Sequence, residues 1–348
     1  MCEAHGGGQD AAAVSRRGMV RTTLLSGAGV AGVAAGLAAA RPAAAAPATP
    51  AAAATRIGRG TDGRAGVTLR WLGVAGWELA FDGRVLYFDP YFSRFDDTVP
   101  GGPLDLHPEV IEELLATGRL AGTAPELIMI SHGHYDHMAD VPYLLDRPAW
   151  RDRTIHVIGT ETHRHLLTAM GVTRSVITAT GGEHLSFGDG AYSVEVIRSL
   201  HSQRSGYGVF APGTLTAPPE RPPATIHDLL EGGTLAYQVT VPGRLKVLMF
   251  GGTNFAAREL AGLRPDVVMV SMTDHSRVHD YLGRLLRALG EPRYLLPSHH
   301  DDMRTPFGSS RLPDTVRHEV VDELRAAVRA AGLSTQVLPV THLEPIHL

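Results

Sequence analysis

The sequence has almost no cysteine and no excess of positive charge, and each absence excludes a class of function. Its one cysteine among 348 residues is Cys2, so a disulfide framework and a thiolate-rich metal site are both excluded. The formal net charge is -4, which argues against a surface that binds nucleic acid or another polyanion. Any metal ion must therefore be held by nitrogen and oxygen, and the 18 histidines can supply the nitrogen.

The first part of the chain also lacks a long run of large apolar side chains. Arg16 and Arg17 precede an uncharged, Ala- and Gly-rich stretch from Thr22 to Ala40, and an Ala/Pro run with A-x-A sites follows. This order is typical of a secretory signal, and the paired arginines resemble the twin-arginine type. The stretch is too poor in large side chains for the ~20 strongly apolar residues that a stable membrane span needs, although a retained anchor is the alternative. We expect a signal peptide over 1–46, a linker over 47–66, a folded domain over 67–348, and export to the cell envelope or the extracellular space.

The order of apolar segments in the remaining chain predicts an α/β protein. Short strand-like segments come first and then alternate with helical patterns, twice over, which predicts two packed sheets with helices outside. Asp82-Gly83 between two apolar segments predicts a tight hairpin. The Pro/Gly-rich stretch 203–234 is long for a loop in a compact domain, so we expect it to cover the functional site, with a plain surface insertion as the alternative. The expected strands are 67–71, 77–81, 85–88, 127–130, 154–158, 192–197, 235–240, 246–250, 267–270 and 294–296, and the expected helices are 108–115, 162–170, 276–289 and 315–331.

The strongest functional signal is a histidine-rich segment directly after the apolar run 127–130. It reads Ser131-His132-Gly133-His134-Tyr135-Asp136-His137. A strand end followed by a glycine-containing loop can turn several side chains toward one point, and imidazole and carboxylate groups are the ligands that zinc and similar ions accept. An ion held this way, with one open position, lowers the pKa of bound water to about 7 and supplies a hydroxide nucleophile. The segment therefore predicts a metal-dependent hydrolase, with Asp136 as the catalytic residue that orients the water and accepts its proton.

The H-x-H-x-D-H pattern after a strand resembles the metallo-β-lactamase superfamily. Two further segments, Leu69-Arg70-Trp71-Leu72-Gly73 and Leu86-Tyr87-Phe88-Asp89-Pro90-Tyr91-Phe92, look like the branch that contains the ascorbate-6-phosphate lactonase and the N-acylphosphatidylethanolamine phospholipase D group. The resemblance runs from about residue 67 to about residue 305. It implies an αββα four-layer sandwich with the metal ions at one edge between the sheets. It also implies Zn²⁺, as one or two ions with Mn²⁺ as an alternative, and a small-molecule or lipid-like substrate with an ester, lactone or phosphodiester bond.

The resemblance also implies which residues hold the metal ions. A first ion would be bound by His132, His134 and a later histidine, for which His201 fits. A second ion would be bound by Asp136, His137 and a histidine near the C-terminal end, for which His299 is expected and His300 is the alternative.

One position departs from the family pattern. Where the family commonly has an aspartate that bridges both metal ions, this chain has Gly252 in Gly251-Gly252-Thr253-Asn254. Asn254 and Asp274 are candidates for a substitute ligand or an outer-shell role. A one-metal enzyme, or a metal-binding protein that kept the fold with reduced catalysis, is therefore the alternative to a two-metal hydrolase.

Other polar residues give weaker expectations. His163 and His165 lie on a helical pattern and are expected on its solvated face, and Arg94 is expected on the surface. Asp89 follows a strand near the expected site, where it either forms a turn or supports a ligand. No feature of the sequence indicates an oligomeric state.

Overall fold

The computed structural model describes residues 55–56 and 66–348 of the chain. The expected signal peptide, residues 1–46, lies outside the described residues, as does most of the expected linker 47–66. Within that linker the short strand β1 (Thr55–Arg56) pairs in parallel with the last strand of the chain, β15 (Pro345–His347). None of the helices in the described part is both long and apolar enough to cross a bilayer.

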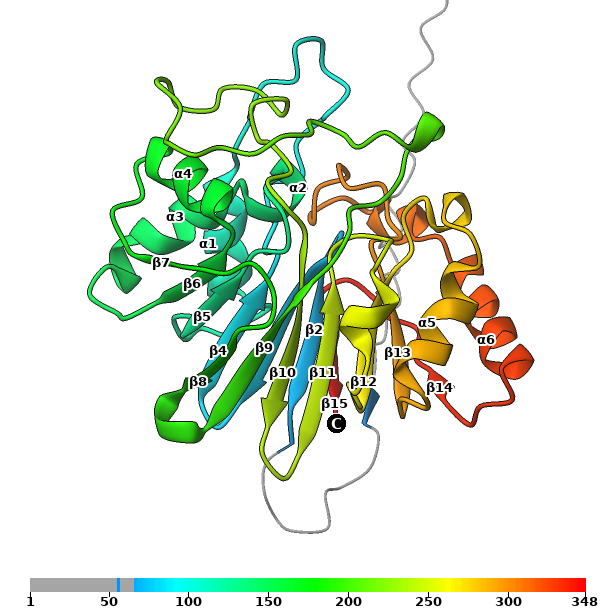
Figure 1. Cartoon of the computed structure of the whole chain (residues 1–348). Coiled ribbons are helices and arrows are strands. Elements are labelled where there is room, and N and C mark those ends of the chain that lie inside the picture. The colour runs from blue at the N-terminus through cyan, green and yellow to red at the C-terminus, as the bar shows by residue number, and fades with distance from the viewer. Residues whose placement is uncertain (1–54, 57–65) are drawn as a thin grey trace, which may run out of the picture. The chain divides into compact units, whose positions relative to one another are not determined.

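Two mixed β-sheets face each other in the middle of the molecule (Figure 1). The first sheet has the strand order β1-β15-β2-β3-β4-β5-β6-β7, with β2 (Thr68–Gly73), β3 (Gly76–Phe81), β4 (Arg84–Phe88), β5 (Leu127–Met129), β6 (His156–Gly159) and β7 (Val176–Thr178). The second sheet has the order β14-β13-β12-β11-β10-β9-β8, with β8 (His184–Phe187), β9 (Tyr192–Arg198), β10 (Leu235–Val241), β11 (Leu245–Phe250), β12 (Val267–Ser271), β13 (Tyr294–Ser298) and β14 (Gln336–Val337).

Alternation along the strands divides the apolar side chains into three cores. In β4, Leu86 and Phe88 face the core between the sheets, while Val85 and Tyr87 face the outer core beside the first sheet. In the second sheet Val268 of β12 faces the outer core, between its neighbours Val267 and Met269 in the inner one. Strands that are apolar on both faces need cover on both sides, which explains their near-continuous apolar runs.

Helices supply the outer cover on each side. The outer core of the first sheet includes apolar residues of α1 (Pro108–Ala116), α3 (Val141–Asp146) and α4 (Glu161–Ala169). The outer core of the second sheet includes apolar residues of α5 (Tyr281–Leu289) and α6 (Glu319–Ala330). The short α2 (Tyr135–Met138) follows β5. The layers are therefore helix, sheet, sheet and helix, which confirms the predicted αββα sandwich.

Most of the predicted elements are present, and the exceptions are short or interrupted. Asp82 and Gly83 have φ values of 47° and 73° and form the predicted hairpin between β3 and β4. The helix expected over 276–289 begins only at Tyr281. Asp280 has a left-handed backbone conformation and separates it from the 3₁₀ turn His275–Arg277. The helix expected over 315–331 is likewise shortened to α6. The sequence patterns did not predict α2, α3, β7, β8, β14 or β15, whose two to six residues are too few to show a period.

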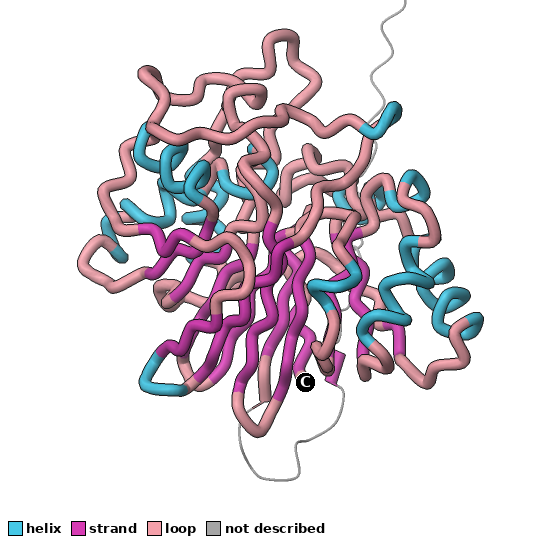
Figure 2. The backbone as a smooth tube through the Cα atoms, in the orientation of Figure 1, coloured by secondary structure: helices cyan, strands magenta, loops and turns pink. Residues whose placement is uncertain are grey.

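The strand directions bring polar loops together at one edge of the sandwich. Strands β4 and β5 are parallel, and β9, β11, β12 and β13 all run in one direction in the second sheet. The carboxyl ends of parallel strands meet at the same edge of a sheet. Figure 2 shows long loops gathered at this edge, in contrast to the tight turns at the opposite edge.

Arg94 is not a surface residue, and that expectation is wrong. Its side chain is fully buried and donates to Asp301 at 2.8 Å, with a longer contact of 3.3 Å to Asp302. Asp301 also contacts His342 Nε2 at 2.8 Å and accepts from the backbone of Val74 at 3.1 Å. Burial alone would raise the pKa of Asp301, but the Arg94 guanidinium and His342 outweigh it and hold the pKa well below its ordinary value.

This buried pair makes a testable contribution to stability. Asp301→Asn should lower the free energy of unfolding by about 3 kcal/mol, because it leaves the buried Arg94 charge with only its longer contact to Asp302. Urea denaturation measures the change. Asp146→Asn is a matched control, because Asp146 pairs with Arg151 at the surface and the change should cost at most ~1 kcal/mol. A lowered carboxyl pKa stabilises the fold fully above the unfolded-state pKa of about 4 and less as the pH falls below it. The wild type should therefore lose more stability than the variant between about pH 5 and pH 3, and equal acid sensitivity would contradict the pairing.

Candidate metal centre

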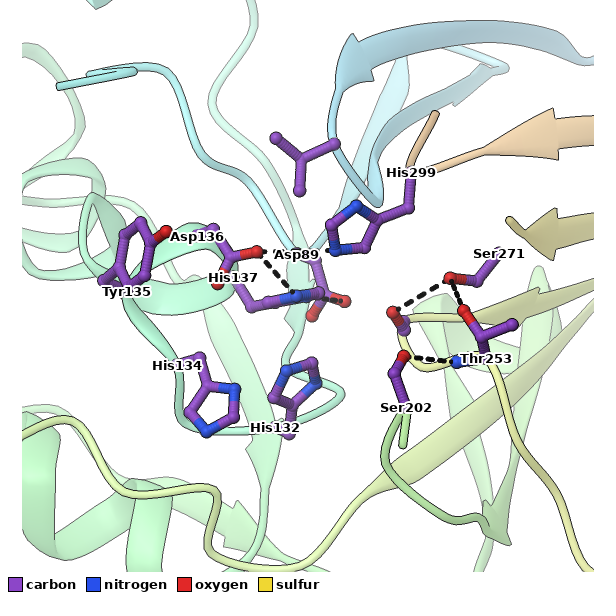
Figure 3. Close-up of polar contacts among 12 residues, drawn as sticks. Asp89, His132, His134, Tyr135, Asp136, His137, Ser202, Thr253, Ser271 and His299 are labelled. Carbon is purple, nitrogen blue, oxygen red and sulfur yellow. Dashed lines mark hydrogen bonds and ion pairs between the residues drawn. The ribbon is translucent and has the colours of Figure 1, made fainter. Parts of the chain in front are cut away.

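The predicted histidine segment lies at the carboxyl end of β5, facing the second sheet. The chain leaves β5 at Met129, passes through the loop 131–134 and enters α2 at Tyr135 (Figure 3). Gly133 is required here, because a Cβ at this position would lie 2.1 Å from the carbonyl oxygen of Leu230. Its N–H donates to the carbonyl of Glu231 at 2.9 Å, so the stretch 203–234 is fixed against the loop at this point.

The structure brings His132, His134 and His201 into one cluster. His201 follows β9, and its Nε2 lies 3.2 Å from Nε2 of His132 and 3.1 Å from Nδ1 of His134. His132 and His134 are buried, and His201 is half-buried. One nitrogen from each ring therefore points at a common position.

In His132 and His201, Nδ1 faces away from the common position and is hydrogen-bonded, which leaves Nε2 free to act as a ligand. The hydroxyl of Ser131 donates to Asp89 at 2.6 Å, so Nδ1 of His132, 2.9 Å away, has to donate to Ser131 Oγ. His201 Nδ1 donates to the carbonyl of Ser202 at 2.7 Å. Both rings then carry an unprotonated Nε2 at the common position. Lone pairs that face each other across about 3 Å repel unless a proton or a cation lies between them.

The electrostatics of the cluster favour neutral rings. Burial lowers the pKa of His132 well below its ordinary value and that of His134 to about 3, and it also lowers the pKa of His201. Neutral imidazole is the form that binds a metal ion. The three rings therefore fit a site with three nitrogen ligands and an open position, as catalytic zinc sites have.

Asp136, His137 and His299 form a second cluster beside the first. Oδ2 of Asp136 lies 3.3 Å from Nε2 of His137 and 3.4 Å from Nε2 of His299, which follows β13. The rings of His132 and His137 are 3.7 Å apart, so the two clusters are adjacent. Burial alone would lower the pKa of His137, but the carboxylates of Asp136 and Asp89 raise it to about 10. The two buried carboxylates beside His137 favour a positive charge at this place, and a divalent cation can supply it.

Asp89 fixes the ligands from behind, at the end of β4. Its carboxylate accepts from the backbone N–H of Ser131 at 2.7 Å and from the Ser131 hydroxyl, and it lies 2.8 Å from Nδ1 of His137. Asp89 was expected either to form a turn or to support a ligand, and these contacts are those of a residue that supports His137 and the loop carrying His132. Figure 3 shows its carboxylate behind His137, on the side away from His134.

The side chains of the other candidates have partners outside the two clusters. The side chain of Asn254 accepts from the backbone of Phe255 at 2.9 Å, and Asp274 pairs with Arg277 at 3.1 Å. His300 stacks on Trp71 with ring centroids 4.5 Å apart, while His299 alone joins Asp136 and His137. Within residues 66–348, Asp136 is the one carboxylate in either group of three.

Close packing around the two glycines after β11 explains why no side chain here bridges the two clusters. A Cβ at Gly252 would lie 2.9 Å from the carbonyl oxygen of Leu200 and 3.3 Å from Cα of His201. A Cβ at Gly251 would lie 1.9 Å from Oγ of Ser131. The end of β11 is therefore packed so closely against two ligand-bearing loops that a side chain at either position would displace them.

Two histidines were placed wrongly by the sequence analysis. His163 and His165 are buried, not solvated. His163 is part of a capping box: its Nδ1 accepts from the N–H of Thr160, and its Nε2 lies 3.3 Å from the carbonyl of Glu231. Burial lowers its pKa to about 4, so the ring is neutral and links α4 to the stretch over the site. The capping-box pattern in sequences has Glu or Gln at this position, so Thr160-x-x-His163 gives no such signal.

No protein-family model and no curated protein matches the chain. Among solved structures, the metallo hydrolase Igni18 from Ignicoccus hospitalis is 18% identical, with 81% of this chain and 98% of that chain covered and a TM-score of 0.50. The metallo-beta-lactamase fold protein YhfI from Bacillus subtilis is 13% identical, with 82% and 100% covered and a TM-score of 0.49. The isothiocyanate hydrolase from Delia radicum gut bacteria is 16% identical, with 81% and 98% covered and a TM-score of 0.48. The four layers and the likeness to Igni18 show that the chain has the metallo-β-lactamase fold.

The support from Asp89 can be tested by metal binding. Asp89→Asn should weaken metal binding by about 10–100-fold, because the variant no longer offers a carboxylate to orient His137 and Ser131. Competition with a chromophoric chelator measures the affinity. Glu183→Gln is the control: Glu183 also accepts backbone N–H bonds, from Thr180 and Gly181, but in a separate loop. An unchanged affinity in the Asp89 variant, or an equal loss in the control, would contradict the role.

Proposed function

We propose that this protein is an exported, metal-dependent hydrolase that cleaves an ester, lactone or phosphodiester bond in a small or lipid-like molecule. The observation that carries the proposal is the convergence of five imidazoles and one carboxylate on two adjacent positions. The export signal rests on residues 1–46, outside the described residues. The bond type rests on the resemblance of the segments around Trp71 and Asp89 to the lactonase and phospholipase D branch.

The donor set fits zinc, with manganese as an alternative. His132, His134 and His201 would hold the first ion through Nε2, Nδ1 and Nε2, and Asp136, His137 and His299 would hold the second. A divalent ion bound there supplies Lewis acidity and activates water at neutral pH. Imidazole nitrogen with a single carboxylate oxygen suits zinc better than calcium or magnesium, which prefer oxygen.

The residues of the chain contribute orientation and proton transfer. Asp136 belongs to the second cluster, where its carboxylate contacts His137 and His299, so it can orient a water molecule there and accept its proton. Ser131 and Ser202 fix the tautomers of His132 and His201. With these tautomers, the ligand nitrogens of His132 and His201 are unprotonated, so the two rings need no reorganisation when an ion binds.

The first cluster should be essential for turnover. His134→Ala should lower kcat by about 10³-fold or more, because it removes one of three nitrogen ligands to the ion that activates water. Assays on generic lactone and phosphodiester substrates with added Zn²⁺ or Mn²⁺ measure the loss. His184→Ala, at an exposed position of β8, is the control. Near-normal activity in the His134 variant with an unchanged fold would refute the assignment.

The two ions should differ in how tightly they are held. Each position has three ligands and no bridging carboxylate at Gly252, but an ion at the second has to displace a proton from His137, whose pKa is raised to about 10, whereas the rings at the first are neutral. The second ion should therefore leave first during dialysis against a chelator, while the first ion stays bound. Metal analysis after stepwise dialysis measures the stoichiometry. Two ions that leave together would contradict this difference.

The same glycine favours one alternative, a metal-binding protein with reduced catalysis. Such a protein would bind zinc stoichiometrically but would hydrolyse neither the lactone nor the phosphodiester substrate under any metal supplement. The proposed hydrolase would bind zinc and also hydrolyse substrate. The acidic net charge of -4 argues against a nucleic-acid substrate in either case.

A further inference from the structure

The stretch 203–234 is a fixed wall over the metal centre. Its backbone is bonded to three separate parts of the fold: the ligand loop at Gly133, the helix α4 region, and the loop that follows β4. Leu215 N–H donates to the Thr162 hydroxyl at 2.9 Å, and Ile226 N–H donates to the carbonyl of Gly102 at 2.7 Å. Groups on this wall therefore have a defined place relative to the ligands.

Phe210 is the side chain of this wall that meets the first cluster. Its ring packs edge-to-face on His134, with centroids 5.1 Å apart, and also contacts the ring of Tyr135 at 6.3 Å. The Phe210 ring is only half-buried, so part of its surface remains open beside the ligand nitrogens. The backbone of Phe210 also lies close to His134, so Phe210 borders this residue through both its main chain and its ring.

Other large apolar side chains are exposed on loops connected to the site. The large apolar residues that are strongly exposed in the described chain are Val99, Leu106, Leu200 and Tyr207, and Tyr207 is 82% exposed. Leu200 directly precedes the ligand His201, and Val99 and Leu106 lie on the loop that pairs with the wall at Pro103 and Thr225. Apolar side chains left exposed on loops of a site can contact an apolar ligand.

Two polar residues also lie near the Phe210 ring. The guanidinium of Arg204 lies 5.4 Å from the ring centroid, and the ring of His227 lies 5.0 Å from it. Both residues are exposed, and a charge in contact with water, such as that of Arg204, contributes little to binding. The side chain of this wall that packs against His134 is therefore apolar, with polar groups beside it.

From this geometry we infer that Phe210 determines specificity, and that the substrate places an apolar group, aromatic or alkyl, against its ring beside the first metal position. This inference rests on the proposed function, since it deepens the same site.

Two thiols test the inference without requiring turnover. Benzyl mercaptan and mercaptoacetate share a thiol that can bind zinc, but one carries an apolar ring and the other a carboxylate. Calorimetric titration of the zinc-loaded protein, after its zinc content is measured, gives both affinities. Phe210→Ala should weaken benzyl mercaptan binding about 5- to 10-fold and change mercaptoacetate binding less than about 2-fold.

Leu215→Ala is the matched control, because Leu215 is a half-buried apolar residue of the same wall that packs on the outer core. It should leave both affinities unchanged. Equal losses for both thiols in the Phe210 variant, no loss for either, or the same loss in the Leu215 variant would each overturn the specificity role. Wild-type protein that holds zinc but binds neither thiol would also overturn it. Protein that retains no zinc would instead refute the proposed metal centre, and the inference with it.

Discussion

The carboxylate of Asp89 is the interaction on which the rest of the site depends. It is fully buried, it follows β4 with a left-handed φ of 43°, and it accepts both groups that Ser131 can donate. Through Ser131 it sets the tautomer of His132, and through its direct contact it orients His137. One side chain therefore links the first sheet to a ligand in each cluster. A buried carboxylate with these contacts is stable only while its donors stay in place, so the order of the ligand loop and the burial of Asp89 support each other.

Two residues on the opposite side of the site also have a strained backbone. Val74 and His299 have positive φ values of 49° and 53°, which are unfavourable for side chains of these types. The His299 N–H donates to the carbonyl of Val74 at 2.6 Å, and Trp71 Nε1 donates to the same carbonyl at 2.9 Å. The N–H of Val74 in turn donates to Asp301, which the buried Arg94 neutralises. The buried ion pair thus stabilises the turn at Val74 that orients His299 toward Asp136.

The sequence predicted the local parts of this site and missed what depends on distant contacts. His132, His134, Asp136 and His137 lie within six consecutive residues, because the loop after β5 and the start of α2 carry all four. His201 and His299 followed only from the resemblance, since their proximity is set by the directions of β9 and β13. Arg94 and His163 were placed on the surface because no local pattern reveals a partner about 200 residues away or a capping role. The fold class was predictable because the buried strands are long apolar runs with clear turns.

The close packing of β11 against the ligand loops gives the two metal positions different electrostatics. The first position is surrounded by three imidazoles that burial keeps neutral, so an ion there would keep its full charge for polarising a substrate or a water molecule. The second lies beside Asp136, with Asp89 behind His137, so an ion there would be partly neutralised. A carboxylate at Gly252 would have lowered the charge at both positions, and the contacts of this glycine with Leu200 and His201 leave no room for one. The missing side chain would therefore make an ion at the first position the stronger Lewis acid and leave one at the second dependent on Asp136, the group proposed to accept the proton.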